Sequence, residues 1–165
     1  MPHHTITTPI GPLTLIAEDD GLHGIRFATE RRPVPAGDTA QPDHPVLAET
    51  ARQLGEYFAG ERREFDLPLR PAGTAFQLAA WRGLRAIPYG RTVSYGEQAR
   101  RLGHPGRARA VGAANGRNPL PIVVPCHRVI GADGSLTGFG GGLEIKAWLL
   151  DHERRVAGET LPFSS

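Results

Sequence analysis

Residues 94–117, SYGEQARRLGHPGRARAVGAANGR, decide how the C-terminal half of this chain folds. Ser94 and Glu97 have the spacing of a capping box, which predicts the start of a short helix. Residues 103–106 predict a turn, and the small, alanine-rich residues 107–115 predict a second helix that a glycine closes. Two short helices joined in this way are typical of a helix-turn-helix unit, although ordinary helix corners share the pattern.

Residues 118–130, NPLPIVVPCHRVI, follow directly and carry the one cysteine of the chain, Cys126. Three prolines remove backbone donors and exclude a regular helix, so this segment is predicted to be extended or turning. The apolar run before Cys126 predicts a thiol at the edge of a core. His127 and Arg128 stand beside it, and both favour the reactive thiolate. An inert buried cysteine is the alternative, but such a residue has no use for polar neighbours.

A nucleophilic cysteine served by a histidine also needs a carboxylate that orients the imidazole. The predicted helix 143–155 offers three candidates, Glu144, Asp151 and Glu153. Between the cysteine and this helix, residues 138–142 read GFGGG, and their glycines allow a close backbone approach to a ligand. The run lacks the Lys-Ser/Thr of a phosphate-binding loop, so it predicts either a lid over a flat substrate or an ordinary turn.

The rest of the chain supplies a strand-rich N-terminal part and one more helix. Alternating apolar residues predict three strands, Thr5–Ile10, Leu13–Glu18 and Leu22–Ala28. The proline-rich residues 29–45 predict a loop, Val46–Ala59 a helix, and Arg63–Leu69 a further strand. Thr74 and Gln77 form another capping box, which opens a helix that Pro88 ends.

The predicted fold class is therefore α+β, with a strand-rich N-terminal domain and a helical C-terminal domain that contains a helix-turn-helix. The predicted boundaries are residues 1–70 and 73–156, followed by a tail at 157–165. A length of 165 residues with 39% hydrophobic and 22% charged residues is ordinary for a folded protein of this size. No long apolar stretch, secretory signal or cysteine pair is visible, so we expect a cytoplasmic protein without membrane segments or an internal disulfide.

Positive charge is concentrated in the C-terminal half. The segment Trp81–Arg128 holds nine arginines and one acidic residue, Glu97, while the remainder of the chain carries an excess of acids. This asymmetry indicates a surface that faces a polyanion. A solvated, arginine-rich surface without a partner is the alternative that charge alone leaves open.

The motif Pro125–Val129, with Asn118 before it and residues 138–141 after it, closely resembles the O6-alkylguanine-DNA alkyltransferases, also called methylated-DNA–protein-cysteine methyltransferases. The resemblance extends without a gap from Phe76 to Glu153, whereas the N-terminal part matches only in general layout. It implies DNA repair by a single-turnover enzyme that moves an alkyl group from O6 of guanine onto its own cysteine. The size of the alkyl group and activity on O4-alkylthymine stay open.

The resemblance also implies a role for each matching residue. Cys126 is expected to accept the alkyl group, His127 to act as general base through a water, and Glu153 to orient the imidazole. Tyr95 is expected to donate toward guanine N3, and Asn118 to support the active-site turn. The substrate pocket is expected to include Val129, Phe139 and Gly140. Phe139 stands where the family often has Tyr, and Gly140 where some members have Ser.

Family members bind double-stranded DNA with the second helix of the helix-turn-helix in the minor groove and flip the damaged nucleotide into the pocket. Small side chains on that helix suit a narrow groove. By resemblance, Arg109 fills the vacated stack and Tyr95 helps to rotate the phosphate. The expected DNA contacts are Arg109, Tyr95, Ala110, Gly112, Asn115, Arg117 and Arg128.

No cofactor is expected. Some relatives hold zinc on N-terminal cysteines and histidines, but here His3, His4 and His23 have no cysteine companion, so no metal site is predicted. A monomer is expected, with cooperation between copies along DNA left open. Two other functions fit parts of the pattern. A thiol acyltransferase or hydrolase would leave the basic helices without a purpose, and a non-repairing sensor of alkylated DNA would not need Cys126.

Overall fold

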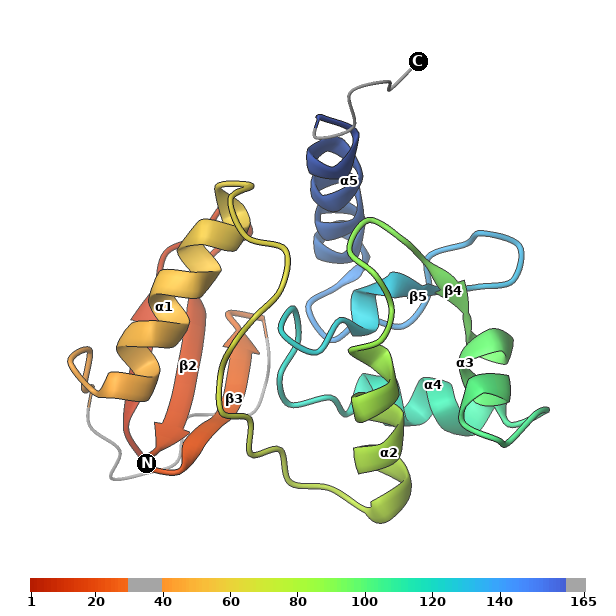
Figure 1. Ribbon diagram of the computed structural model, residues 1–165, viewed down its shortest axis with the longest axis horizontal. Coiled ribbons are helices and arrows are strands. Elements are labelled where there is room, and N and C mark those ends of the chain that lie inside the picture. Colours follow the sequence, from red (N-terminus) through yellow and green to blue (C-terminus); the bar gives the residue numbers. More distant parts are fainter. Residues whose placement is uncertain (30–39, 160–165) are drawn as a thin grey trace. The chain divides into compact units, whose positions relative to one another are not determined.

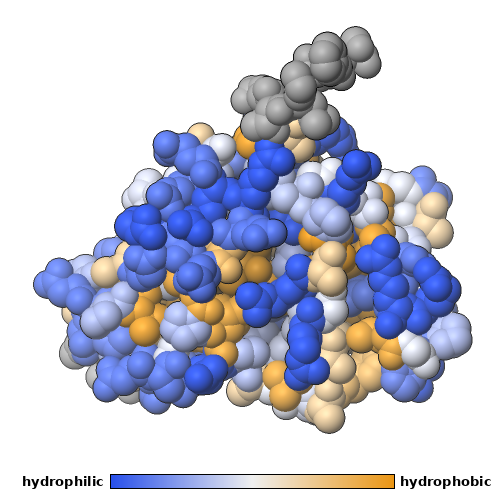
Figure 2. Space-filling view, in the orientation of Figure 1, coloured by the Kyte–Doolittle hydropathy of each residue, from blue (hydrophilic) through white to orange (hydrophobic). Residues whose placement is uncertain are grey.

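The computed structural model describes residues 1–29 and 40–159, and the chain divides into two compact units, Met1–Ala72 and Gly73–Ser165 (Figure 1). The first unit holds a three-stranded sheet and the second holds most of the helices, which confirms the predicted α+β class. Within the described ranges, no helix is both long and apolar enough to cross a membrane. Figure 2 shows hydrophilic residues over much of the face in view, with apolar residues in smaller patches.

The N-terminal unit is an antiparallel sheet with one helix. Its strands, β1 (His3–Ile6), β2 (Leu13–Glu18) and β3 (Gly21–Phe27), pair in the order β1-β2-β3, and α1 (Pro45–Phe58) contacts them. Apolar side chains from β2 and β3 are buried together with those of α1 and form the core of the unit. The first strand ends at Ile6 rather than Ile10, because residues 8–11 close a turn through hydrogen bonds of the Thr8 hydroxyl. Most of the predicted loop at 29–45 lies outside the described residues.

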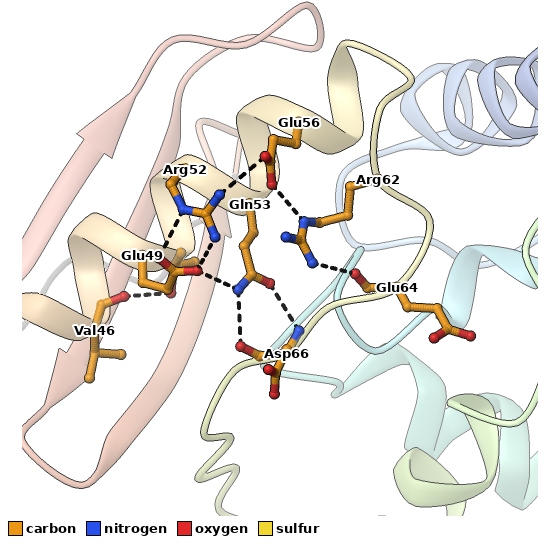
Figure 3. Close-up of polar contacts among 9 residues, drawn as sticks. Val46, Glu49, Arg52, Gln53, Glu56, Arg62, Glu64 and Asp66 are labelled. Carbon is orange, nitrogen blue, oxygen red and sulfur yellow. Dashed lines mark hydrogen bonds and ion pairs between the residues drawn. The ribbon is translucent and has the colours of Figure 1, made fainter.

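The strand predicted at Arg63–Leu69 does not form. Gln53 of α1 instead satisfies both backbone groups of Asp66: its amide donates to the Asp66 carbonyl at 3.0 Å and its oxygen accepts from the Asp66 N–H at 2.9 Å (Figure 3). Pro68 has no N–H to offer a ladder, and one isolated bridge between Leu22 and Leu69 remains. The prediction was wrong because a buried side chain replaced the partner strand.

The helical unit contains four described α-helices, one short 3-10 helix and a small sheet. In chain order they are α2 (Ala75–Leu84), β4 (Val93–Ser94), α3 (Tyr95–Arg101), α4 (Ala108–Gly116), η1 (Cys126–Arg128), β5 (Val129–Ile130) and α5 (Leu143–Glu159). β4 pairs in parallel with β5, with Val93 opposite Val129. Because α3 starts directly after β4 and β5 directly follows η1, this pairing brings the start of α3 beside the cysteine segment.

The helix ends follow the predicted caps in part. Thr74 and Gln77 form the complete capping box predicted for α2. Ser94 accepts from the Glu97 N–H, but the Glu97 carboxylate binds Arg100 instead of returning to the cap. Helix α4 includes Gly116, which was predicted to close it. Helix α5 runs to Glu159, past the Arg155 predicted from the sequence, so residues 157–159 of the predicted tail are helical.

Candidate active site

Asn118 holds the turn that carries the cysteine. Its Nδ2 donates to the Val124 carbonyl at 2.8 Å, and its Oδ1 accepts from the Leu120 N–H at 3.0 Å. Inside the turn, Ile122 has a φ of 74°, a left-handed conformation that is costly for a β-branched side chain. The two bonds of Asn118 span this residue, and Cys126 follows at the start of η1.

Cys126 is 8% exposed, and burial raises the pKa of its thiol above the usual value. A hydrogen bond with Asn118 and the charge of Lys146 lower the pKa but do not outweigh burial. The thiol is therefore protonated at rest. Neither His127 nor Arg128 is among the groups that lower the pKa of the resting thiol, because both side chains bind Glu153.

His127 and Glu153 form a buried pair. His127 Nε2 lies 2.7 Å from Glu153 Oε2, and the side chains are 0% and 1% exposed. Burial lowers the pKa of His127, and Arg128 and Lys146 lower it further, while Glu153 raises it. His127 is thus neutral, with the proton on Nε2 facing the carboxylate. Its Nδ1 is buried and has no hydrogen-bond partner in the described part of the chain, which leaves a lone pair for an incoming proton.

Arg128 completes this network. Its Nε and Nη2 donate to Glu153 Oε1 and Oε2 at 2.8 and 3.1 Å, and its Nη1 donates to the Ile87 carbonyl at 2.7 Å. Burial by itself raises the pKa of Glu153, but His127 and Arg128 outweigh it and hold that pKa well below its usual range. Arg128 was expected to contact DNA, but it is 6% exposed and turned inward, so that expectation is corrected: its charge is used by Glu153.

Lys146 is a buried residue that the sequence reasoning missed. Its Nζ donates to the carbonyls of Val129 at 2.6 Å and Thr137 at 2.7 Å, and lies 3.5 Å from the Tyr95 hydroxyl. None of these partners is a carboxylate, which is unusual for a lysine with 0% exposure. The signal available was that this chain uses arginine everywhere else. A lone lysine indicates a place for a compact ammonium rather than a guanidinium.

Tyr95 and the glycine-rich segment meet at one carbonyl. The Tyr95 hydroxyl donates to the Thr137 carbonyl at 2.9 Å, and a Cβ added to Gly138 would lie 3.7 Å from that hydroxyl. Among the expected pocket residues, Val129 is fully buried, Phe139 is half-buried and Gly140 is exposed. The Val129 carbonyl already accepts from Lys146, so a guanine that bonds to this carbonyl would share it.

The residues expected to contact DNA separate into two groups. Arg109 and Arg117 are exposed at α4, and no ion pair of either is found in residues 1–29 and 40–159. Ala110 and Gly112 are half-buried on the same helix. A Cβ at Gly112 would lie 3.6 Å from the Tyr95 ring, so α4 passes close to Tyr95. Asn115 is different, because it is buried.

Asn115 is 5% exposed and faces α3, where it exchanges two amide hydrogen bonds with Gln98, at 2.8 and 3.0 Å. Its donors and its oxygen are thereby used inside the protein. The expected DNA contact of Asn115 is therefore corrected to a contact between α3 and α4. Trp81 of α2 fixes the other side of α4, because its Nε1 donates to the Ala114 carbonyl at 2.8 Å.

Of the three histidines considered for zinc, His3 and His4 lie in β1, and within residues 1–29 and 40–159 only His23 belongs to a cluster of ligand-type groups, with Glu18 and Asp20. Their ligand atoms come within 4.8 Å of one another. Both carboxylates are exposed, and the ring of His23 already bonds to Asp20 at 2.9 Å. This arrangement is that of a surface hydrogen bond.

Two models of known families match the chain. Residues 75–155 match the DNA binding domain of 6-O-methylguanine DNA methyltransferase, and residues 1–71 match the ribonuclease-like domain of the same family. The matches therefore cover both compact units.

Similar proteins cover nearly the whole chain. The methylated-DNA–protein-cysteine methyltransferase of Mycolicibacterium paratuberculosis is 53% identical over 154 residues, which are 93% of this chain and 92% of that protein. Its counterpart in Methanosarcina acetivorans is 47% identical and covers 88% of this chain and 94% of its own. The crystal structure of Mycobacterium tuberculosis OGT in complex with DNA is 47% identical, covers 94% of each chain and superposes with a TM-score of 0.88.

Proposed function

The chain belongs to the 6-O-methylguanine DNA methyltransferase family, and we propose that it repairs DNA by moving an alkyl group from O6 of guanine to Cys126. The resemblance predicted from the motif at Pro125–Val129 is thereby confirmed. The observation that carries the proposed site is a buried thiol followed directly by His127, whose imidazole is held by Glu153 at 2.7 Å. No cofactor is needed for this transfer.

His127 activates the thiol. Because Nε2 faces Glu153, Nδ1 is the nitrogen that receives the proton of Cys126, through a bridging water, and Glu153 stabilises the imidazolium that results. The thiolate then attacks the alkyl carbon. A bond from Sγ to carbon forms, the bond from carbon to O6 breaks, and its electron pair leaves with guanine. The thioether is stable, so each molecule reacts once.

Tyr95 assists the leaving base by donating its proton to guanine N3. Its hydroxyl lies at the start of α3, beside β5, and bonds to the Thr137 carbonyl until a substrate takes that bond. The backbone of Val129 and Gly140 is proposed to recognise guanine, and Phe139 to cover it. Asn118 supports the reaction through the turn that it holds, and it lowers the pKa of the thiol.

Double-stranded DNA is the partner, and α4 is proposed to enter its minor groove. Arg109 and Arg117 are exposed there, and the small residues Ala110 and Gly112 let the helix backbone approach a narrow groove. Flipping a nucleotide costs a few kcal/mol, less for a poorly paired base, and Arg109 offsets part of this by filling the gap. We infer a cytoplasmic protein that acts on DNA as a monomer.

Intact mass and peptide mapping test the assignment. After incubation with a duplex that contains O6-methylguanine, the peptide with Cys126 is expected to gain the mass of one methylene. Cys126→Ser should gain nothing yet bind the duplex with similar affinity. An unmodified Cys126 under conditions in which the complex forms would contradict the proposal. Repeated hydrolysis of an ester with burst kinetics would favour a thiol hydrolase instead.

A further inference from the structure

We propose that Arg128 is a positioning residue of the proton relay: it holds both oxygens of Glu153 so that one of them meets His127. This inference rests on the proposed function and assigns Arg128 a role inside the site instead of at the DNA surface. Its side chain touches no reacting atom. It acts through the carboxylate.

The guanidinium is held from several sides. Two of its nitrogens bind the two oxygens of Glu153, a third binds the Ile87 carbonyl, and the Tyr89 ring lies 5.5 Å from its central carbon. A planar fork of this kind fixes the plane of a carboxylate, which the single ammonium of a lysine does not. The orientation of Glu153 is thus set by a side chain that is itself locked.

The two oxygens of Glu153 have separate tasks. Oε1 accepts from Arg128 Nε at 2.8 Å and faces the Gly90 N–H at 3.4 Å, while Oε2 faces His127 Nε2 at 2.7 Å. Gly90 reaches this place with a φ of 76°, and a Cβ there would come within 3.0 Å of Ala157. Without Arg128, Glu153 could rotate and present either oxygen, or neither, to the imidazole.

Charge gives this arrangement a measurable consequence. The charged groups that act on His127 are Glu153 and Lys146 from α5 and Arg128 from η1, and the neutral thiol of Cys126 is its chain neighbour. Glu153 raises the pKa of His127, and both cations lower it. Removal of the charge of Arg128 therefore raises this pKa as long as Glu153 stays in place. Because only neutral His127 can accept the thiol proton, the rate would then fall at a higher pH than before.

The test is the pH profile of single-turnover transfer from free O6-benzylguanine, a substrate without DNA. For Arg128→Met we expect the plateau rate to fall by about tenfold or more, because Glu153 no longer orients the imidazole, and the acid limb to move because a cation beside His127 is gone. Arg155→Gln is the matched control. It removes an exposed arginine from α5 that also pairs with an acid, Asp151 at 3.1 Å, and should leave the profile in place.

A double variant separates positioning from simple structural support. In a Glu153→Gln background, adding Arg128→Met should produce no further fall in the plateau rate, because the carboxylate through which Arg128 acts is gone, while the direct effect of the Arg128 charge on His127 remains. The double variant also removes the uncompensated buried charge that could prevent Arg128→Met from folding. Arg128→Lys, which keeps the charge but not the fork, should react more slowly than the parent, with a smaller shift than Arg128→Met.

The outcomes are distinct. An unchanged plateau rate in Arg128→Met, or an equal fall in that rate with and without Glu153, would overturn the inference. A normal profile with free base and a selective loss on duplex DNA would return Arg128 to the DNA surface. If the parent protein transfers neither the benzyl group of the free base nor the methyl group of the duplex to Cys126, the proposed function fails and not only the role of Arg128.

Discussion

The helical unit uses arginine in two opposite ways. Arg128, on η1, is buried and bound to Glu153 and a carbonyl, whereas Arg109, on α4, is exposed and has no ion pair among the described residues. Burying an unpaired charge costs several kcal/mol, so a buried arginine needs acidic and carbonyl partners inside the protein. The charge of an exposed arginine remains available to bind a polyanion. The count of arginines in Trp81–Arg128 therefore indicates the class of partner but not which residues meet it.

The largest effect is expected on the buried side of this comparison. Glu153→Gln should slow transfer by about 100-fold or more, because His127 loses the carboxylate that supports its charged form. The loss should be equal for duplex DNA and for free O6-benzylguanine, measured in single-turnover reactions. A loss confined to duplex DNA would contradict the separation between the buried network and the DNA surface.

The same carboxylate predicts how stability depends on pH. The pKa of Glu153 is lowered in the folded protein, so the stability it contributes is present above its unfolded pKa and is lost as pH falls. The free energy of unfolding of the parent should thus decrease as pH drops below about 4.3, and that of Glu153→Gln should decrease less. Urea unfolding between about pH 7 and pH 3 gives both slopes. Parallel slopes would show that Glu153 is not held ionised.

The exposed side should respond in the opposite way. Arg109→Ala is expected to slow transfer from duplex DNA by about tenfold or more, since the vacated stack stays unfilled, and to leave free O6-benzylguanine unaffected. The dependence of duplex binding on salt should also weaken by about one ion if Arg109 contacts a phosphate. Arg155→Gln serves again as the control. Equal losses on duplex DNA and on the free base would contradict a role of Arg109 in nucleotide flipping.

Asn115 lies on α4, as Arg109 does, but it is buried like Arg128. Its substitution should have the smallest effect on repair. Asn115→Ala leaves the buried amide of Gln98 without its partner, so we expect a loss of about 1–3 kcal/mol in the free energy of unfolding. Duplex affinity per folded molecule should change by no more than a factor of about two. A loss of about 1.4 kcal/mol in binding free energy would instead lower the affinity about tenfold. Thermal unfolding and DNA titration measure the two quantities. A large loss of affinity without a loss of stability would restore Asn115 to the DNA surface.

Local features of the fold were predicted well and long-range ones were not. The capping box at Thr74 and the two helices around residues 103–106 follow from residues that are neighbours in the chain, and the structure has them. The strand predicted at Arg63–Leu69 depended on a partner far away in the sequence. Gln53 took that partner's place, and no pattern within the segment could have indicated it.

The amino-acid sequence by itself determined the chemistry: one thiol beside His127, a carboxylate on the last helix, and a basic helix-turn-helix. Residue types and spacing left three carboxylates open, the family resemblance implied Glu153, and the tertiary structure shows which of them meets His127. Glu144 and Asp151 are exposed, while Glu153 reaches His127 from a position 26 residues away. It also decided that Arg128 turns inward and that Lys146 is buried. The physical reason is that the free energy of a charge depends on its surroundings, and these are built from segments that meet only when the chain folds.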